Sequence, residues 1–434
     1  MTLIDLTRPS SEAPTTALPV AIIGAGPIGL AAAAHLAERG IPFVVFESGA
    51  DAVASVRAWG HTRLFSPRKH LVDPAAARLL AETGWTLPAP ERAPTGAELV
   101  REYLEPLAGL DAIAPQIRTH TPVIGVSREG MDRTRTRGRA QAPFAVRIRT
   151  AEGAIEEVAA RAVLDASGTY LSPNSLASNG LELLGLAEVA ADVVPALPDV
   201  MGRDRPTFAG RRVTVVGAGH SAANTLLALA ELARTDPETT VTWLIRNARA
   251  TRVSSSPGDE LADRARLGSR VEAALERGEV ALVDGFEIVR AHRSDQGVEL
   301  VGHRAGELVT HVTDVVVNAT GFRPDLSILR ELRLELDDIV EAPRRLAPLI
   351  DPNVHSCGTV EPHGYRELAH PEPGFFIVGM KSYGRAPTFL LATGYEQVRS
   401  VVAWIAGDAD AAASVRLVLP ATGVCSTDAG GCCT

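Results

Sequence analysis

Cysteine is scarce in this chain. Only 4 of its 434 residues are cysteines, and the first of them is Cys357. A scaffold held together by disulfides is therefore excluded. No two cysteines have the C-x-x-C spacing, which also excludes a redox-active dithiol of that usual form.

Long apolar runs without interruption are lacking as well. Residues 18–36 carry almost no charge, but glycines and proline interrupt them, so we expect a buried strand and helix there rather than a membrane span. Residues 1–18 are polar and rich in Pro, Ser and Thr, unlike the basic start and apolar core of a secretory signal. These absences favour a soluble, cytoplasmic protein without a membrane partner.

Positive charge is not in excess, since the formal net charge is −9. This balance argues against a nucleic-acid partner. One stretch, Asp132 to Arg139, is locally basic. It lies between two strand-like runs, so we expect a solvated hairpin tip there.

The sequence does contain two Gly-rich loops, each between an apolar β-branched run and an Ala/Leu-rich run. Gly24, Gly26 and Gly29 have G-x-G-x-x-G spacing, and Pro27 and Ile28 complete the loop. The first Gly permits a tight turn, the second lets the backbone approach a pyrophosphate, and the third lets helix and strand pack closely. The pyrophosphate then binds unpaired N–H groups at the helix N-terminus.

The second loop repeats this pattern almost two hundred residues later. Gly217, Gly219 and Ala222 have G-x-G-x-x-A spacing, with His220 and Ser221 between them. A single such motif is a weak signal, but each loop has the strand and helix context that the motif requires. Two loops about a domain length apart indicate two dinucleotides, and so electron transfer between them.

The residue that ends the next strand distinguishes the two sites. Glu47 follows the first loop at the spacing of an acidic residue that binds a ribose diol, which fits FAD and would also fit NAD. Arg246 holds the equivalent position after the second loop, and a guanidinium suits a 2′-phosphate. The sequence therefore predicts FAD at the first site and NADPH at the second.

Several turns should also lie close to the cofactors. The segment 165–169 with Gly168 and the segment 319–321 with Thr320 and Gly321 each end a strand that closes a nucleotide-binding sheet. Arg63 belongs to a loop near the flavin or the pyrophosphate. A strand over 375–378 leads to Gly379 and Met380, and then to a helix beginning near Pro387 or Thr388, whose N-terminus would stabilise negative charge on reduced flavin.

The predicted fold is α/β, with two Rossmann-like, three-layer ββα domains. The FAD domain is discontinuous, over 19–205 and 324–418, and the NAD(P)H domain of 206–323 is inserted into it. Strand-like runs at 144–150 and 160–168 indicate an antiparallel meander. Thr95 and Glu98 have the spacing of a helix capping box. Flexible tails are expected over 1–18 and 419–434.

These motifs resemble the flavoproteins that have two dinucleotide-binding domains, over nearly the whole chain. GAGHSA with a nearby Asn, together with ATGFRPD, is most similar to the flavin-containing monooxygenases. More narrowly, WGHTRLFSP, LIDPNVHSCGTV and MKSYGRAPTFLLATGYEQ resemble flavoproteins encoded beside arsenic-resistance genes. The resemblance implies FAD, NADPH, O2 and a small soft-nucleophile substrate. The oligomeric state stays open, a homodimer included.

One departure from that family concerns oxygenation. Flavin-containing monooxygenases carry an F-x-G-x-x-x-H signature before the second loop. Here Phe208 and Gly210 are present, but no His lies between His120 and His220. In that family bound NADP⁺ shields the oxygenated flavin from water, so the protection of such a species is in doubt for this chain.

Catalytic candidates lie late in the sequence. Cys357 beside His355 would be an activated thiolate if the imidazolium lowers the thiol pKa, or else a small buried hydrophobe. Lys381 would place a cation near anionic flavin, or else lie on an ordinary surface loop. Cys425, Cys432 and Cys433 occupy a Gly-rich tail; three soft thiolates suit a thiophilic metal or metalloid such as arsenite, although incidental cysteines in a disordered tail would look the same.

Three functions remain open at this stage. The first is an NADPH-dependent flavoprotein monooxygenase, which the resemblance favours. The second is a reductase that sends electrons through Cys357 and the tail thiols to a disulfide or metal(loid). The third is a flavin-bound redox or metalloid sensor without turnover.

Overall fold

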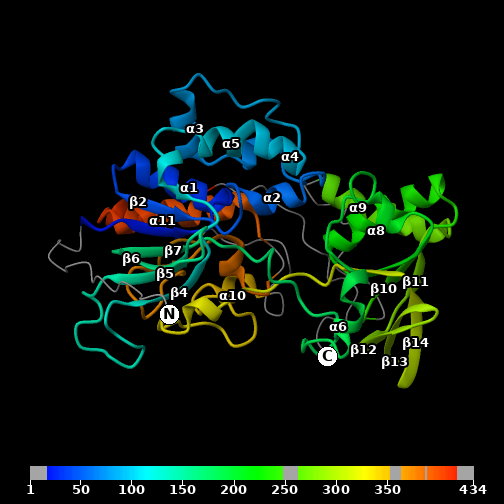
Figure 1. The fold of residues 1–434 in the computed structure, drawn as a ribbon. Helices are drawn as coiled ribbons and strands as arrows, with labels where there is room; N and C mark the ends of the chain where they lie inside the picture. Colours follow the sequence, from blue (N-terminus) through cyan, green and yellow to red (C-terminus); the bar gives the residue numbers. More distant parts are fainter. Residues whose placement is uncertain (1–16, 248–261, 352–362, 387–388, 418–434) are drawn as a thin grey trace.

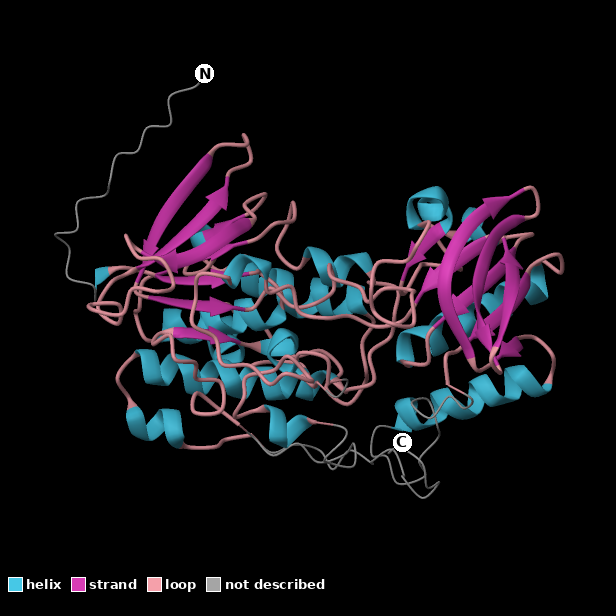
Figure 2. Ribbon diagram, turned by 90° about the horizontal axis from the view of Figure 1, so that it is seen from below, coloured by secondary structure: helices cyan, strands magenta, loops and turns pink. Residues whose placement is uncertain are grey.

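Two parallel β-sheets, each covered by helices, organise the chain (Figure 1). The computed structural model describes residues 17–247, 262–351, 363–386 and 389–417. Figure 2 shows the strands gathered into two groups at opposite ends of the molecule, with loops joining them. No helix within these described ranges is both long and apolar enough to cross a membrane.

The first sheet has five parallel strands in the order β16-β7-β1-β2-β3. Its bounds are β1 Val20–Ile23, β2 Phe43–Phe46, β3 Ile117–Arg118, β7 Ala162–Asp165 and β16 Phe375–Ile377. Every residue of β1, β2, β7 and β16 is buried, as expected for a parallel sheet that is covered on both faces. Helices α1 (Pro27–Glu38) and α11 (Leu391–Ile405) pack against one face. The antiparallel meander β4 (Val123–Arg128), β5 (Phe144–Arg149) and β6 (Ile155–Ala160) covers the other.

The second sheet repeats this architecture in the order β11-β10-β9-β15-β8. Its bounds are β8 Val193–Pro195, β9 Arg212–Val216, β10 Thr240–Leu244, β11 Ala281–Val283 and β15 Val315–Asn318. Helices α8 (His220–Thr235) and α9 (Ala262–Glu276) cover one face. The antiparallel meander β12 (Phe286–Ser294), β13 (Gly297–Arg304) and β14 (Glu307–Thr313) covers the other.

Shorter elements complete the fold. They are α2 Ala54–Ala58, α3 Pro74–Ala81, α4 Gly96–Leu99, η3 Val100–Leu104, α5 Glu105–Ala108, α6 Leu186–Val189, α7 Arg205–Phe208, α10 Ala347–Ile350, α12 Ala409–Ala413 and the 3₁₀ turns Arg68–His70, Ala114–Gln116, Ala190–Asp192, Ser327–Leu329 and Gly379–Tyr383. The predicted capping box is present at α4, where Glu98 N donates to Thr95 Oγ1 and Thr95 N donates to the Glu98 carboxylate.

The two connections between the domains run side by side and are hydrogen-bonded to each other. Asn174 N donates to Gly321 O at 2.9 Å, and Arg323 N donates to Ser172 O at 3.0 Å. An antiparallel bridge joins Pro173 and Phe322 between these bonds. The chain therefore leaves and re-enters the first domain through a paired crossing rather than through two independent linkers.

The structure confirms the predicted α/β class with two dinucleotide-binding folds. Three details differ from the sequence predictions. β8 pairs with β15, so an element before residue 206 already belongs to the second sheet. β7 pairs in parallel with β1, so the meander consists of β4, β5 and β6 and does not include the strand β7 that the 160–168 run forms. Helix α11 begins at Leu391, a few residues beyond the predicted start, because Leu390 still has extended backbone angles.

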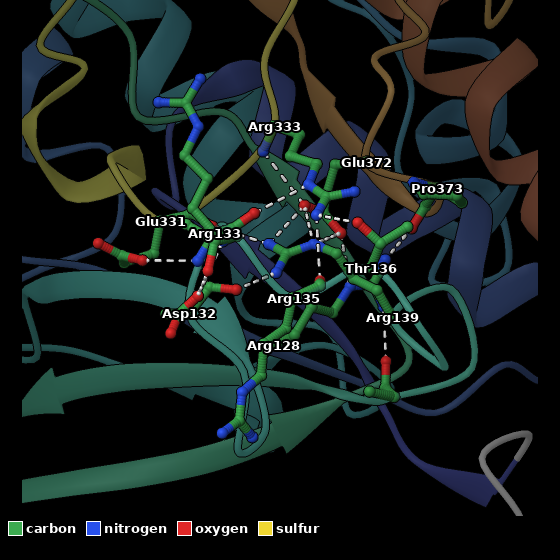
Figure 3. Close-up of polar contacts among 12 residues, drawn as sticks. Arg128, Asp132, Arg133, Arg135, Thr136, Arg139, Glu331, Arg333, Glu372 and Pro373 are labelled. Atoms are coloured by element: carbon green, nitrogen blue, oxygen red, sulfur yellow. Dashed lines mark hydrogen bonds and ion pairs between the residues drawn. The ribbon is translucent and has the colours of Figure 1, made fainter.

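The basic stretch after β4 is only partly a solvated tip. Its arginines at 133 and 135 are exposed, but Arg139 is buried. Figure 3 shows Arg139 and Arg128 converging on Glu372, whose oxygens they approach to 2.7 Å and 2.8 Å. Arg139 also donates to the carbonyl of Glu331 at 2.8 Å. These contacts attach the stretch to the turn before β16. The Glu372 carboxylate is fully removed from solvent, and a buried charge needs such partners.

Candidate functional site

The first Gly-rich loop joins β1 to α1 and has the shape that a pyrophosphate requires. Gly24 has φ of +96°, and a Cβ there would lie 2.8 Å from the carbonyl oxygen of Ala166. A Cβ at Gly29 would lie 1.9 Å from the carbonyl oxygen of Gly24. At Gly26, by contrast, a Cβ would meet no protein atom within 4 Å. Two glycines thus allow close backbone packing, and the middle one leaves space for a ligand.

The N-terminus of α1 is available to an anion. Gly26 is the N-cap, Pro27 holds the first helical turn, no side chain caps the helix and no acidic residue lies in its first turn. The N–H groups at such a terminus and the helix dipole both favour a bound phosphate. Ile28 lies against Gly379, where a Cβ would come within 2.9 Å of its side chain.

Glu47 lies directly after β2 and its carboxylate is held from two sides. Oε2 accepts from Ala25 N at 2.8 Å, and Oε1 accepts from Gly49 N at 2.7 Å. The side chain is half-buried, so the carboxylate is oriented while part of it still faces solvent. A carboxylate fixed beside the first loop can accept hydrogen bonds from a ribose diol.

The second loop has the same construction between β9 and α8. Gly217 has φ of +129°, and a Cβ there would lie 2.1 Å from the carbonyl oxygen of Ala319. Gly219 is the N-cap of α8, no side chain caps that helix, and a Cβ at Gly219 would meet nothing within 4 Å. Ala222 is fully buried at the position of the third motif residue. His220 and Ser221 form the first turn of α8.

The predicted Gly turns occupy equivalent places in the two domains. Ala166, after β7, lies against Gly24, and Ala319, after β15, lies against Gly217. Gly168 has φ of +69° and open space around it, and Gly321 has φ of +99°. The two turns therefore support the first glycine of each loop, as the internal repeat in the sequence predicts.

Arg246 follows β10 and is exposed. Its Nη1 donates to Ser178 O at 3.0 Å, which leaves the guanidinium edge accessible to solvent. An arginine at this strand end, one strand away from an uncapped helix N-terminus, can pair with a 2′-phosphate.

The turn 379–383 carries Lys381 against the carboxyl end of the first sheet. Lys381 Nζ lies 2.7 Å from Asp165 Oδ2 and 3.0 Å from Ser167 Oγ. The lysine side chain is 1% exposed and that of Asp165 is 0% exposed. The ammonium is therefore compensated by a buried carboxylate, a partner that the sequence did not predict, and it lies beside the segment that supports Gly24.

Gln397 of α11 holds the same turn through hydrogen bonds. Its Oε1 accepts from Gly379 N at 2.7 Å, and its Nε2 donates to Ser382 Oγ at 2.9 Å. Its Nε2 also lies 2.8 Å from His363 Nε2. All of these groups are buried. Met380 is half-buried in the same turn, so Gln397 determines where this loop meets the first domain.

Two predicted cofactor residues have protein partners here. Arg63 Nη1 donates to Ala93 O at 2.7 Å, while 47% of the Arg63 side chain stays exposed. Thr320 Oγ1 donates to Asn318 Oδ1 at 2.6 Å and lies 3.1 Å from Asn174 O. Thr320 therefore takes part in the crossing between the domains, and Arg63 belongs to the loop that follows α2.

The remaining candidates lie outside the described residues. These are His355, Cys357, Thr388, Cys425, Cys432 and Cys433. Within the described part, no group of three or more His, Cys, Asp or Glu side chains could hold a metal ion. The proposed thiol chemistry and metalloid site thus stay predictions from the sequence.

Sequence comparison identifies relatives over part of the chain. The chain is 31% identical over 218 residues to the indole-3-pyruvate monooxygenase YUCCA1 of Oryza sativa subsp. japonica. The match covers 49% of this chain and 46% of that protein. The chain thus spans about half the length of the curated relatives it matches.

Structural comparison extends over most of the chain. The bacillithiol disulfide reductase Bdr from Bacillus cereus has a TM-score of 0.66 and 21% identity, over 90% of this chain and 99% of that one. A variant of the flavin monooxygenase from Stenotrophomonas maltophilia has a TM-score of 0.57 and 26% identity, over 89% and 98%. Both share the fold described above.

A family model covers the two loops and most of the sequence between the predicted tails. Residues 21–356 match the model described as pyridine nucleotide-disulphide oxidoreductase. Both loops have open space at the middle glycine and an uncapped helix N-terminus, so the residues present fit two dinucleotides. The chain belongs to the pyridine nucleotide-disulphide oxidoreductase family.

Proposed function

We propose that this protein is an NADPH-dependent flavoprotein monooxygenase that oxygenates a small, soft nucleophile. The observation that carries the proposal is the pair of matching loops, each supported by an Ala turn and each followed by a different strand-end residue. Glu47 selects the ribose of FAD at the first loop, and Arg246 selects the 2′-phosphate of NADPH at the second.

The chain's own residues bind and orient the two dinucleotides. The N-termini of α1 and α8 receive the pyrophosphates, and Lys381, paired with Asp165, holds the 379–383 turn against the first loop. Bound FAD would take a hydride from NADPH and, once reduced, would pass the two electrons to O2. The protein's contribution is therefore positioning, because the difficult chemistry belongs to the cofactor.

Oxygenation is supported by the relatives whose names state a monooxygenase. The sequence resemblance to flavoproteins of arsenic-resistance clusters makes arsenite, whose arsenic lone pair is a soft nucleophile, a substrate to test beside organic sulfides. A role in metalloid resistance rests on that resemblance and on the tail cysteines.

The alternative is a reductase that passes electrons to a disulfide or metal(loid). It is supported by the family description and by the fold of the bacillithiol disulfide reductase. All four cysteines lie in 352–362 and 418–434, outside the described residues. A thiol route from flavin to substrate would therefore have to pass through those two segments.

The fate of the electrons separates these functions. Purified holoprotein is given NADPH and O2 with arsenite or a thioether, and NADPH oxidation, oxygenated product and hydrogen peroxide are quantified together. The proposal expects product formation coupled to NADPH oxidation. Peroxide as the only product with every soft nucleophile would contradict it.

A variant without Cys357, Cys432 and Cys433 is the matched control. Turnover that needs these thiols, with a disulfide as acceptor, would establish the reductase instead. A protein that binds both dinucleotides but does not sustain NADPH oxidation with any acceptor would be the sensor, and this result would also contradict the monooxygenase.

A further inference from the structure

We propose that Phe65 is a positioning residue that docks the FAD domain on the first turn of the NADPH helix α8. It belongs to the loop of residues 59–67, which we call the docking loop. This proposal rests on the proposed function, because it takes the second Gly-rich loop as the NADPH site. In Figure 1 the chain beyond α2 reaches toward the second domain beside α8 and α9.

The docking loop is fastened to the FAD domain by backbone hydrogen bonds. Ala97 N donates to Gly60 O at 2.8 Å, and Gly96 N donates to Thr62 O at 2.9 Å. Leu64 N donates to Pro94 O at 2.9 Å. The loop therefore presents its side chains from a fixed base rather than as a free segment.

Two neighbouring residues of this loop serve different domains. Leu64 packs against the hydrophobic core around α1 and α11. Phe65 packs against the core of the second domain, and its ring centroid lies 5.4 Å from that of His220 at an interplanar angle of 58°. This distance and tilt are within the range of favourable aromatic pairs.

A charge interaction also joins the docking loop to the same domain. The pKa of Asp204 is held below its ordinary value, mainly by the hydrogen bond from Arg203, with a smaller contribution from the charge of His61. Asp204 immediately precedes α7. The charge of His61 therefore acts on the second domain beside the direct contact of Phe65.

His220 makes the contact relevant to the cofactor. It is the first residue of α8, directly after Gly219, in the turn where the pyrophosphate of NADPH would bind. Because Phe65 and His220 belong to different domains, their contact favours one orientation of that turn before the dinucleotide arrives. A site organised in advance loses less free energy on binding, so NADP⁺ affinity should depend on Phe65.

The test measures NADP⁺ binding to the FAD-loaded protein by titration calorimetry. Phe65→Ala should raise the Kd roughly 3- to 10-fold, the size expected for one aromatic contact, with FAD content unchanged. Phe65→Trp should restore most of the affinity. Leu64→Ala is the matched control: it lowers the melting temperature but keeps the NADP⁺ Kd.

A double-mutant cycle with His220→Ala tests the contact itself. If Phe65 acts through His220, Phe65→Ala has little further effect once His220 is replaced. Where Phe65→Ala does not yield folded protein, Phe65→Leu keeps apolar volume but removes the ring, and should also weaken NADP⁺.

The outcomes separate this proposal from the proposed function. An unchanged Kd in Phe65→Ala, or additive effects in the cycle, would overturn the role of Phe65 while leaving the NADPH site intact. Failure of the wild-type protein to bind NADP⁺ at all would instead overturn the assignment of the second loop.

Discussion

Lys381 and Asp165 form an ion pair of 2.7 Å between side chains that are both buried. Asp165 is the last residue of β7, and Lys381 lies in the turn after β16, the neighbouring strand at the edge of the first sheet. Ser167 Oγ also donates to Asp165, at 2.6 Å. The pair therefore joins the 379–383 turn to the segment that supports Gly24, and so connects two parts of the proposed FAD site.

Replacing Lys381 alone should destabilise the protein strongly. Lys381→Met leaves the Asp165 carboxylate buried without its counter-charge, which typically costs about 3–5 kcal/mol. The double variant Lys381→Met/Asp165→Asn should recover part of this loss. Urea unfolding of the wild type, Lys381→Met, Asp165→Asn and the double variant checks it. A double variant destabilised by the sum of the two single effects would contradict a coupled pair.

Alanine substitutions at two glycines of the first loop should have different effects. Gly29→Ala places a Cβ 1.9 Å from a backbone oxygen, so the fold itself should be destabilised. Gly26→Ala meets no protein atom within 4 Å, so the apoprotein should keep its melting temperature but lose FAD. If Gly26→Ala keeps its full FAD content, FAD does not occupy the space beside this residue.

Glu47→Gln should weaken FAD binding about 10- to 100-fold, since hydrogen bonds to a charged group contribute roughly 1.5–3 kcal/mol. The amide has one acceptor oxygen, so either Ala25 N or Gly49 N loses its partner. Fluorescence titration of the apoprotein with FAD measures the change. Glu38→Gln, at the end of α1 where Glu38 pairs with Arg78, is the control and should leave FAD affinity unchanged.

Arg246→Ala should weaken NADPH far more than NADH, by about 10-fold or more, because the lost group pairs with a phosphate that only NADPH carries. The ratio of kcat/KM for the two nucleotides is the measurement. Arg234→Ala, which removes a surface pair with Glu279, should not alter that ratio. An equal decrease in kcat/KM for both nucleotides would mean that Arg246 does not bind the 2′-phosphate.

His370 should make stability depend on pH in acid. Burial lowers its pKa to about 4, below the ordinary value of about 6.5. Between these values the unfolded chain binds a proton that the folded chain does not, so the free energy of unfolding falls as pH falls. His370→Asn should flatten this slope between about pH 6.5 and 4. The free energy of unfolding is measured by urea unfolding at each pH. If it depends on pH equally in the wild type and in His370→Asn, this account is contradicted.

The sequence predicts the parts of the site that depend on local backbone geometry. Gly24, Gly26 and Glu47 follow from a motif of fixed spacing, and the Thr95 capping box follows from four consecutive residues. The Ala turns were predicted because their pattern repeats. Each of these signals depends on neighbours in the chain.

The sequence does not predict contacts between distant segments. Gln397, Asp165 and Phe65 acquire their roles from residues far away in the chain, as when Gln397 binds Gly379 through α11 packing behind the turn. Glu372 is similar, since its arginine partners lie more than two hundred residues earlier. The spacing of such residues in the sequence does not predict their contacts, because tertiary packing alone brings them together.

Anaerobic mixing of the FAD-loaded protein with NADPH tests the central claim most directly. The account predicts that NADPH abolishes the visible absorbance of oxidised flavin within the time of turnover, that NADH does so far more slowly, and that Arg246→Ala removes most of this difference. Flavin that stays oxidised under NADPH would contradict electron transfer between the two sites.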